Sequence, residues 1–328
     1  MLFEAWDDAL RSTCGHYYAV PRDGQRSVDG HFQAERLCGL DIANFAGNIR
    51  RIDRTRQGIR LDEHEHLYLL VQLTGSIRIE RQNDNSILLP GALYLLDSTW
   101  PVRIGFDGSR PHCLSLHLPR AASLANAVTP LRLGQVLDGT VPIVKRLHSY
   151  IVNAMHHRET GPKAEPEYLL DLTRLAFASG GSQRDVCKTL SQRSRFELAV
   201  QEIETFVARP EMSLTWLSDR IGISARQLER DFQAHETSFV QLCREQRLKL
   251  VCNFIELAKR SGREVGVTDV AFASGFRDLS NFNRAFRARF GLTPRDYIRS
   301  ARYQAAPTGA LRAVAYTIEP SRSLAASP

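Results

Sequence analysis

The sequence contains no long hydrophobic run and no signal segment. Its longest nearly apolar stretch, from Ile87 to Leu96, contains Pro90 and Gly91 and falls far short of the roughly 20 residues that a membrane-spanning helix needs. The first residues, MLFEAWDDALRST, are acidic and lack the basic segment followed by an apolar run that marks a secretory signal. These absences predict a cytoplasmic protein that has no membrane partner.

Motifs of catalysis, cofactor binding and metal binding are also missing. The six cysteines are scattered without a CxxC pair, which indicates reduced thiols rather than disulfide bridges or a metal site. No GxSxG, P-loop or strand-linked GxGxxG motif occurs. We therefore expect no catalytic residues, no cofactor and no bound metal. What is present is an ordinary globular composition over 328 residues, which favours two domains, and a net charge of +7, which is compatible with nucleic acid.

The chain divides into regions with different hydrophobic periods. Residues 1 to about 120 read as short strands separated by turns, which predicts an all-β barrel or jelly roll in a domain that covers 1–134. The expected strands cover about 67–73, 76–80, 87–89, 92–96, 102–106 and 113–118. Residues 135–180 change to a helical period, and the Gly- and Ser-rich residues 181–193 predict a linker. Short helices follow over 194–303, and the weakly patterned tail 304–328 is expected to be disordered. The predicted fold class is therefore a multidomain α+β protein.

Apolar residues mark one face of each helix expected between 135 and 180. In the first helix the spacing is three or four residues, and in the second a similar stripe follows. The two stripes are Val144, Leu147, Ile151 and Met155, and then Leu169, Leu172, Leu175 and Ala176.

An internal duplication is the most informative feature of the C-terminal region. LTWLSDRIGISARQLERDF at 214–232 aligns with VTDVAFASGFRDLSNFNRAF at 267–286, with Gly222 matching Gly275. Each copy predicts a short helix, a glycine-centred turn and a second helix, with a small residue (Ser218 or Ala271) where the two helices meet. This is the pattern of a helix-turn-helix, whose second helix enters the major groove of DNA. The two units are expected at about 214–235 and 267–290.

The stretch between the two units predicts one long helix over Ser238–Lys259. Such a connector would hold the two recognition helices apart, and a separation near 34 Å would place them in successive major grooves. The distribution of charged residues along the C-terminal region also favours DNA binding. Residues 277–302 contain seven arginines against two aspartates, whereas residues 194–276 hold 11 basic and 12 acidic side chains. The basic part is expected to bind phosphates.

These residues resemble the DNA-binding domain of AraC/XylS-type transcription regulators. The resemblance covers about 196–300 and is most specific in Gly275-Phe276, Phe282, Arg284, Phe286, Phe290-Gly291, Thr293-Pro294 and Tyr297. It implies an activator that binds double-stranded promoter DNA and contacts RNA polymerase. The sequence departs from the family after Phe232, where members place a glycine and this chain has HETS, so that Glu236 or Thr237 takes the place of the glycine.

The resemblance assigns contacts with DNA to solvent-facing residues of the two recognition helices. Arginine reads guanine, glutamine and asparagine read adenine, and glutamate accepts a hydrogen bond from cytosine. Arg230 and Arg284 are candidates for base or phosphate contact. Glu229 either reads a base or forms an ion pair with Arg226, and Leu279 either contacts a thymine methyl group or is half-buried. The candidate DNA-binding residues are Arg226, Gln227, Glu229, Arg230, Arg277, Ser280, Asn281, Arg284, Arg287 and Arg289.

The first half resembles the effector-binding half of the regulators of phenylethylamine and aromatic-acid (anthranilate- or benzoate-type) dioxygenase pathways. The resemblance rests on Trp6, Cys14-Gly15, 52–55, 72–75, Pro90-Gly91, 95–97, Pro101 and 118–120. It implies a cupin-like barrel that binds a small aromatic effector from a catabolic pathway. It also implies that the helices at 135–180 form a homodimer. A carboxylate effector would need a cation, so the candidate contact residues are His64, His66, Tyr68, Arg78 and Arg103.

His64 and His66 leave three alternatives open. The pair lies two residues apart at the head of an expected strand and would share one face. Paired histidines of this kind bind metals in cupin enzymes, so the alternative function is a metal-dependent cupin oxygenase fused to a DNA-binding domain. No acidic residue follows between Leu67 and Ile79, although His112 and His117 lie downstream. The pair otherwise contacts an effector or forms an ordinary strand end.

Overall fold

The computed structural model describes residues 1–81, 84–106, 110–125, 127, 129–156, 166–179, 187 and 190–301. The chain forms two compact units, the first from Met1–Leu198 with Ser218–Asp231 and the second from Ala199–Leu217 with the residues from Phe232 on. The expected linker at 181–193 lies mostly outside the described residues, and the expected tail at 304–328 lies entirely outside them. Across the described chain, no helix is both long and apolar enough to cross a membrane.

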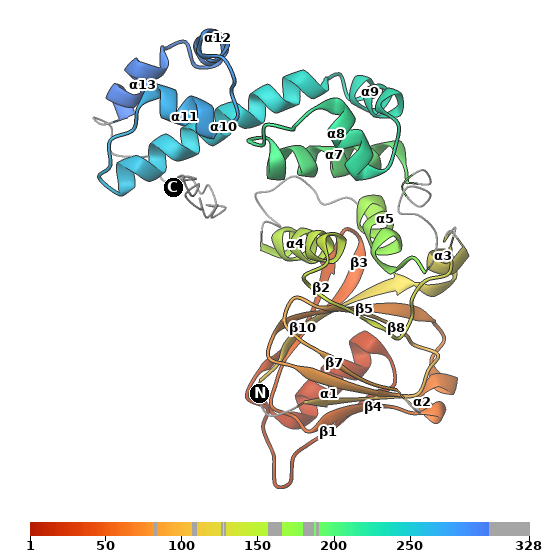
Figure 1. Cartoon of the computed structure of the whole chain (residues 1–328). Helices are drawn as coiled ribbons and strands as arrows, with labels where there is room; N and C mark the ends of the chain where they lie inside the picture. The colour runs from red at the N-terminus through yellow and green to blue at the C-terminus, as the bar shows by residue number, and fades with distance from the viewer. Residues whose placement is uncertain are drawn as a thin grey trace, which may run out of the picture. The chain divides into compact units, whose positions relative to one another are not determined.

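Two antiparallel sheets form a β-sandwich in the first unit (Figure 1). The five-stranded sheet has the order β1-β4-β9-β6-β7 and the six-stranded sheet has the order β11-β8-β5-β10-β3-β2. This arrangement confirms the predicted jelly-roll class. The strands are β1 (Tyr17–Val20), β2 (His31–Leu37), β3 (Leu40–Ala46), β4 (Arg51–Arg54), β5 (His66–Thr74), β6 (Ile77–Arg81), β7 (Asp84–Leu88), β8 (Leu93–Asp97), β9 (Val102–Phe106), β10 (His112–Pro119) and β11 (Val136–Leu137).

Side-chain alternation determines which residues fill the interior. In β9, Val102, Ile104 and Phe106 are buried while Arg103 is exposed, as expected for a sheet with one face against the core. In the six-stranded sheet, Leu67–Gln72 of β5 are all buried. Both faces of this strand are therefore covered, and Figure 1 shows α4 (Pro142–His156) and α5 (Pro166–Phe177) beside its sheet.

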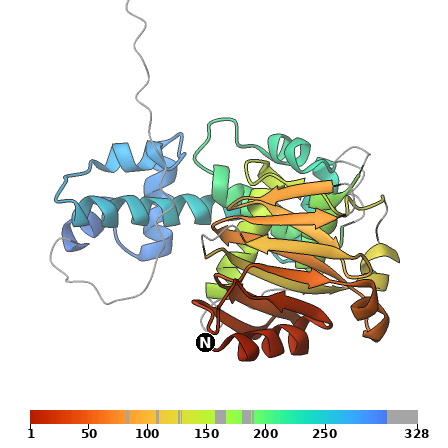
Figure 2. The same ribbon diagram turned by 90° about the horizontal axis from the view of Figure 1, so that it is seen from below.

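The first helix is a correction to the sequence-based interpretation of residues 1–120 as strands and turns. Residues Phe3–Cys14 form α1, which buries Trp6, Leu10 and Cys14 at a spacing of four. The Trp6 ring meets Phe32 edge-on at 5.3 Å, and its Nε1 donates to the His31 carbonyl oxygen at 3.2 Å. Figure 2 shows this helix lying under the strands. The helical spacing was present in the sequence, but the polar residues between these positions concealed it.

The helical segments after the sandwich confirm their predicted faces. Val144, Leu147 and Ile151 of α4 are buried and Met155 is half-buried, while the stripe of α5 is buried throughout. His148 of α4 hydrogen-bonds to the backbone of Gln72 in β5, and burial lowers the pKa of this histidine. Among the described residues before 190, this unit also contains α2 (Arg56–Leu61) and α3 (Arg120–Ala125).

Seven helices occupy the described residues from 190 on. They are α7 (Gln192–Phe206), α8 (Leu214–Ile221), α9 (Ala225–Ala234), α10 (Phe239–Arg260), α11 (Val267–Ala273), α12 (Leu279–Phe290) and α13 (Pro294–Ala301). The single long helix that the sequence predicts between the two repeats is α10, and the Ser238 side chain accepts a hydrogen bond from the Gln241 N–H at its start.

The second unit has its own aromatic core. Apolar residues from α10, α11 and α12 pack together, with Phe286 at the centre of the aromatic contacts. Its ring lies 5.6 Å from Phe282, 4.5 Å from Phe290 and 5.3 Å from Tyr297 of α13. This core holds α12 against the C-terminal half of α10. The buried members are Leu248, Val251, Ile255, Val270, Ala271, Phe276, Phe282 and Phe286.

Candidate nucleic-acid interface and effector site

The turn of the first helix-turn-helix is built around Gly222. Its φ of 86° lies in the left-handed region that favours glycine. The N–H groups of Gly222 and Ile223 both donate to the Ser218 carbonyl oxygen, at 2.8 and 3.1 Å. Ser224 then begins α9, because its Oγ accepts the Gln227 N–H at 3.2 Å.

The second turn has a similar geometry, although the Gly275 N–H donates to the Phe272 carbonyl oxygen at 2.9 Å rather than to that of Ala271. Gly275 has a φ of 87°, and the Phe276 N–H donates to the Ala271 carbonyl oxygen at 3.1 Å. Asp278 begins α12 by accepting the Asn281 N–H at 2.6 Å. A Cβ on Gly275 would lie 2.7 Å from the Val207 carbonyl oxygen, so the position requires glycine for space as well as for conformation. The duplicated sequence therefore folds into a duplicated structure.

Three of the four predicted DNA-binding residues of α9 are exposed to solvent. Arg226, Glu229 and Arg230 are exposed, and no ion pair joins Glu229 to Arg226 in the described part of the chain. Gln227 differs, because it is half-buried and its Nε2 donates to Asp231 Oδ1 at 3.0 Å. This bond occupies the amide, so Gln227 supports the helix in this structure rather than facing outward.

Helix α12 presents Ser280, Asn281 and Arg284 to solvent. The Arg284 guanidinium donates to Asn281 Oδ1 at 2.7 Å, which orients both side chains on one exposed face. Leu279 is half-buried against the aromatic core. Of the two alternatives given for Leu279, the half-buried position is therefore the one that the structure shows.

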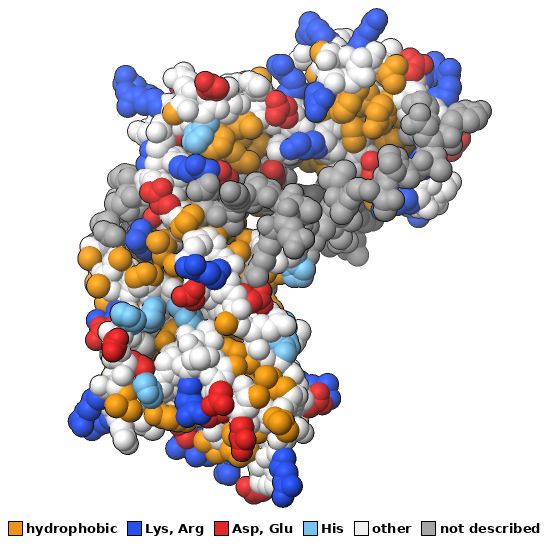
Figure 3. Space-filling model, turned by 180° about the vertical axis from the view of Figure 1, so that it is seen from behind, with side chains coloured by type: hydrophobic (Ala, Val, Ile, Leu, Met, Phe, Trp, Pro, Cys, Tyr) orange, Lys and Arg blue, Asp and Glu red, His pale blue; other side chains and the backbone are white. Residues whose placement is uncertain are grey.

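The predicted phosphate-binding arginines are exposed. Arg277, Arg287 and Arg289 all lie at the surface, and the Arg289 guanidinium lies 5.5 Å from the centre of the Phe290 ring. On the face drawn in Figure 3, Lys and Arg side chains gather over the C-terminal helices. The structure thus places the basic stretch where it can contact a polyanion.

In the turn after α9, a glutamate adopts the left-handed conformation for which members of the family use a glycine. Glu236 has a φ of 53° and is the residue in the left-handed region. Thr237 donates its N–H to the Phe232 carbonyl oxygen at 3.1 Å and leads into α10. The chain therefore makes the turn with a glutamate, at a cost of about 1 kcal/mol relative to a residue without Cβ.

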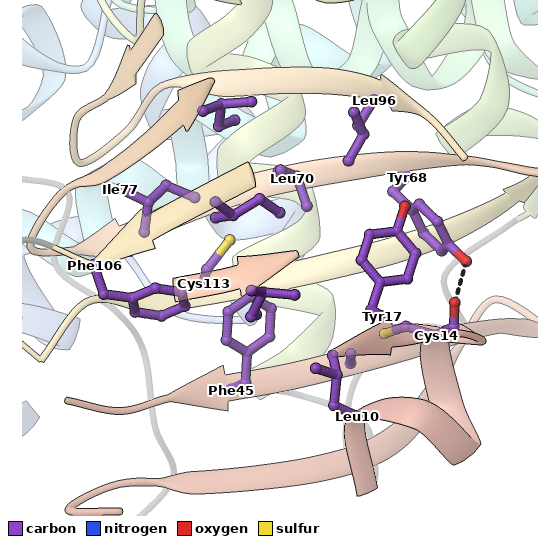
Figure 4. Close-up of a cluster of buried hydrophobic side chains, with 14 of the residues drawn as sticks. Leu10, Cys14, Tyr17, Phe45, Tyr68, Leu70, Ile77, Leu96, Phe106 and Cys113 are labelled. Atoms are coloured by element: carbon purple, nitrogen blue, oxygen red, sulfur yellow. Dashed lines mark hydrogen bonds between the residues drawn. The ribbon is translucent and has the colours of Figure 1, made fainter. Parts of the chain in front are cut away.

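The sandwich interior contains a polar group at one end of an apolar core (Figure 4). Tyr68 Oη donates to the Cys14 carbonyl oxygen at 2.7 Å, and the His117 ring lies 4.7 Å from the Tyr68 ring. Burial lowers the pKa of His117 to about 4, so its imidazole is neutral near pH 7. Within the described residues, Tyr17 Oη is buried and has no hydrogen-bond partner.

Among the described residues, the side chain of Arg54 brings a cation to this interior. Arg54 is 3% exposed, and its guanidinium lies 4.6 Å from the centre of the Tyr17 ring. The Arg54 guanidinium already has two partners within the protein, because it forms an ion pair with Asp62 and donates to the Ser98 carbonyl oxygen at 3.2 Å. His16 also contacts Asp62, and these two hydrogen-bonding partners together lower the pKa of the carboxyl against the opposing effect of its burial.

The five predicted effector residues do not form one cluster. Tyr68 is buried in the interior and His66, at the start of β5, stacks on it at 5.8 Å. His64 is exposed and precedes the strand, so it does not share the strand face with His66. Arg78 and Arg103 are exposed on the outer face of the five-stranded sheet, and Arg103 pairs with Asp53 at 3.2 Å. In the described chain, no group of three or more His, Cys, Asp or Glu side chains is arranged to hold a metal.

Sequence reasoning named Cys14 and His117 in other connections, but it placed neither of them, nor Tyr17, in the sandwich interior. Cys14, Tyr17 and His117 come from α1, β1 and β10, and no local pattern links such distant positions. Asp231 could have been found, because Gln and Asp four apart on a helix form hydrogen bonds. Its ion-pair partner Arg195 lies 36 positions earlier and carries no such signal.

A duplicated helix-turn-helix that follows a β-sandwich defines a DNA-binding transcription regulator with a separate N-terminal domain. A family model for an AraC-binding-like domain matches residues 6–177, and a helix-turn-helix domain model matches residues 217–300. The chain belongs to the AraC family of transcriptional regulators. This membership identifies a regulator rather than the cupin oxygenase that the histidine pair had left open.

The chain is similar to two curated activators. It is 24% identical to the transcriptional activator RhrA of Rhizobium meliloti (strain 1021), over 69% of this chain and 68% of that protein. It is 22% identical to the transcriptional activator NphR of Rhodococcus sp, over 88% of this chain and 86% of that protein. Among solved structures, the AraC-like transcriptional activator CuxR matches with a TM-score of 0.44 and 15% identity, over 83% of this chain and 95% of CuxR.

Proposed function

We propose that this protein is a cytoplasmic activator of an aromatic-compound catabolic operon. It would bind promoter DNA through α9 and α12, respond to a small aromatic effector held in the sandwich, contact RNA polymerase and dimerise through α4 and α5. In this proposal the domains have the boundaries expected from the sequence, with the effector-binding domain at 1–134, the dimerisation helices at 135–180 and the DNA-binding domain at 194–303. The DNA-binding part is supported by one observation: each turn has a left-handed glycine followed by a residue whose N–H donates five positions back, to Ser218 or Ala271, and each leads into a helix with exposed arginines.

The effector part is supported by the unpartnered Tyr17 hydroxyl. A buried hydroxyl without a partner costs roughly 1–3 kcal/mol, and an effector that accepts its hydrogen bond would recover that cost. Since Asp62 and the Ser98 carbonyl oxygen already hold Arg54, the interior favours an aromatic effector with an uncharged acceptor. The exposed Arg78 and Arg103 do not supply the cation that a carboxylate would need.

Calorimetry with an aromatic acid and its methyl ester tests this assignment. We expect the ester to bind more tightly than the acid to the wild-type protein, and Tyr17→Phe to weaken ester binding about fivefold or more. Arg103→Gln is the matched control, because this side chain lies on the outer face, and it should leave the affinity unchanged. Tighter binding of the acid would favour a carboxylate effector instead.

The DNA-binding part is tested by selecting duplexes from a random-sequence pool with the full-length protein. We expect enrichment of sites with two subsites spaced about one helical turn, roughly 10 base pairs. Dimerisation would add a second copy of this site and would be seen by light scattering. A pool without enrichment would contradict sequence-specific binding.

A further inference from the structure

The first recognition helix carries a buried carboxylate that is shielded from solvent. Asp231 of α9 is fully buried. Arg195, near the start of α7, donates to it twice, from Nε to Oδ2 at 2.7 Å and from Nη2 to Oδ1 at 2.9 Å. Gln227 provides a third hydrogen bond at 3.0 Å. The carboxylate is therefore held in one orientation from two helices.

The same arginine connects α9 to the segment that leaves the sensing half. Arg195 Nη1 also donates to the Leu190 carbonyl oxygen. The next residue, Ser191, donates its N–H to Asp171 Oδ2 of α5 at 3.2 Å, and Asp171 is also paired with Arg174 at 2.9 Å. A continuous set of polar contacts thus runs from α5 through the start of α7 to α9.

The two recognition helices differ in this respect. The residues 218–231, which include most of α9, belong to the same compact unit as the sandwich and α5, whereas α12 belongs to the other unit. The polar contacts described for α12 are local, from Asp278 to Asn281 and from Arg284 to Asn281. Any change in α5 therefore has a direct polar route to α9.

We propose that the Arg195–Asp231 pair is a positioning device through which the sensing half controls the first recognition helix and leaves the second unaffected. The proposal rests on the proposed DNA-binding function. The planar guanidinium fork holds a carboxylate in a defined direction, which an ammonium group cannot do. A shift of α5 would move Ser191 and Arg195. Through Asp231 it would then change the direction in which the exposed Arg226 and Arg230 of α9 point.

The test uses the full-length protein and a duplex selected from a random pool by the wild-type chain. Arg230→Ala and Asn281→Ala first identify which base pairs each helix reads. Binding of Arg195→Lys and Asp171→Asn to duplexes altered at either subsite is then measured. We expect each variant to lose about tenfold discrimination at the α9 subsite, the size of one lost bidentate base contact, and less than about twofold at the α12 subsite.

Two further variants separate positioning from stability. Arg195→Met with Asp231→Leu replaces the buried pair by apolar groups, which is often neutral or favourable for folding. It should keep the melting temperature near that of the wild type and still lose discrimination at the α9 subsite. Arg36→Lys alters an exposed ion pair with Asp41 at 3.1 Å and should change neither subsite.

Wild-type discrimination at both subsites in the double variant would overturn the proposal, as would an equal loss at both subsites in every variant. Either result differs from a failure of the proposed function, in which the wild-type chain would enrich no duplex at all. The comparison of two subsites within one molecule supplies a readout that general loss of folded protein would not produce.

Discussion

Ser218 and Ala271 hold equivalent places in the two helix-turn-helix units. The carbonyl oxygen of each accepts the N–H of the residue five positions later, and both distances are 3.1 Å. Both residues are buried, with 4% and 0% exposure. Small side chains are needed here because the second helix of each unit begins directly after this contact. The equivalence makes the two turns sensitive to the same kinds of substitution.

Gly275→Ala should destabilise the protein by at least about 2 kcal/mol. The left-handed φ costs a residue with Cβ about 1–2 kcal/mol, and the added Cβ would meet the Val207 carbonyl oxygen at 2.7 Å. Gly262→Ala is the matched control, since its φ is also positive at 67° but nothing lies within 4 Å of the added Cβ. Urea unfolding of both variants measures the difference. Equal losses would show that the close approach to Val207 is unimportant.

Glu236→Gly should stabilise the protein by about 0.5–1 kcal/mol. Relief of the left-handed strain at Glu236 exceeds the extra entropy that glycine brings to the unfolded chain. Glu236→Ala keeps a Cβ and should give no comparable gain. Thermal unfolding of the three proteins provides the comparison, and a destabilised glycine variant would mean that the glutamate side chain makes a net favourable contribution.

His117 should make stability depend on pH between about 6.5 and 4. Its folded pKa of about 4 lies below the ordinary value near 6.5. Over this range the unfolded chain therefore binds the proton first, and stability falls as the pH falls. The loss from this group is on the order of 3 kcal/mol by pH 4. His66, whose pKa is also lowered by burial, acts in the same direction.

His117→Gln should reduce this dependence, because glutamine does not titrate. Asp62 is a separate influence: its pKa is lowered, so its contribution is lost only below the ordinary carboxyl range near 3.9. Urea unfolding at pH 7, 6, 5 and 4 distinguishes the two groups. An unchanged slope in the glutamine variant would assign the dependence to other residues.

Arg287→Ala and Arg289→Ala should each lower DNA affinity by similar factors for all sequences. Each exposed arginine that neutralises a phosphate releases a counterion, so the slope of log K against log salt should fall by about 1 per substitution. Arg36→Ala removes an exposed arginine from β2 and should leave the slope unaltered. A slope that neither substitution changes would place Arg287 and Arg289 away from the phosphates.

Much of the architecture was predictable from local patterns. The two repeats, the long helix from Ser238 and the alternating strands such as Val102–Phe106 all have periods that backbone geometry imposes over a few residues. The conversion of Gly222 and Gly275 into turns also follows from local conformational preference. In these elements each residue's neighbours along the chain are sufficient to determine its structure.

The candidate sites were less predictable because they depend on neighbours that are distant in the chain. Local patterns in the sequence predicted solvent-facing arginines on the two recognition helices and a barrel or jelly roll in the first half. They did not predict that Gln227 supports Asp231 instead of facing outward, that Arg195 holds this carboxylate, or that Arg54 rather than Arg78 or Arg103 reaches the interior. Burial and ion pairing depend on which strands and helices meet, and alternation along one strand does not reveal which of its faces will be covered.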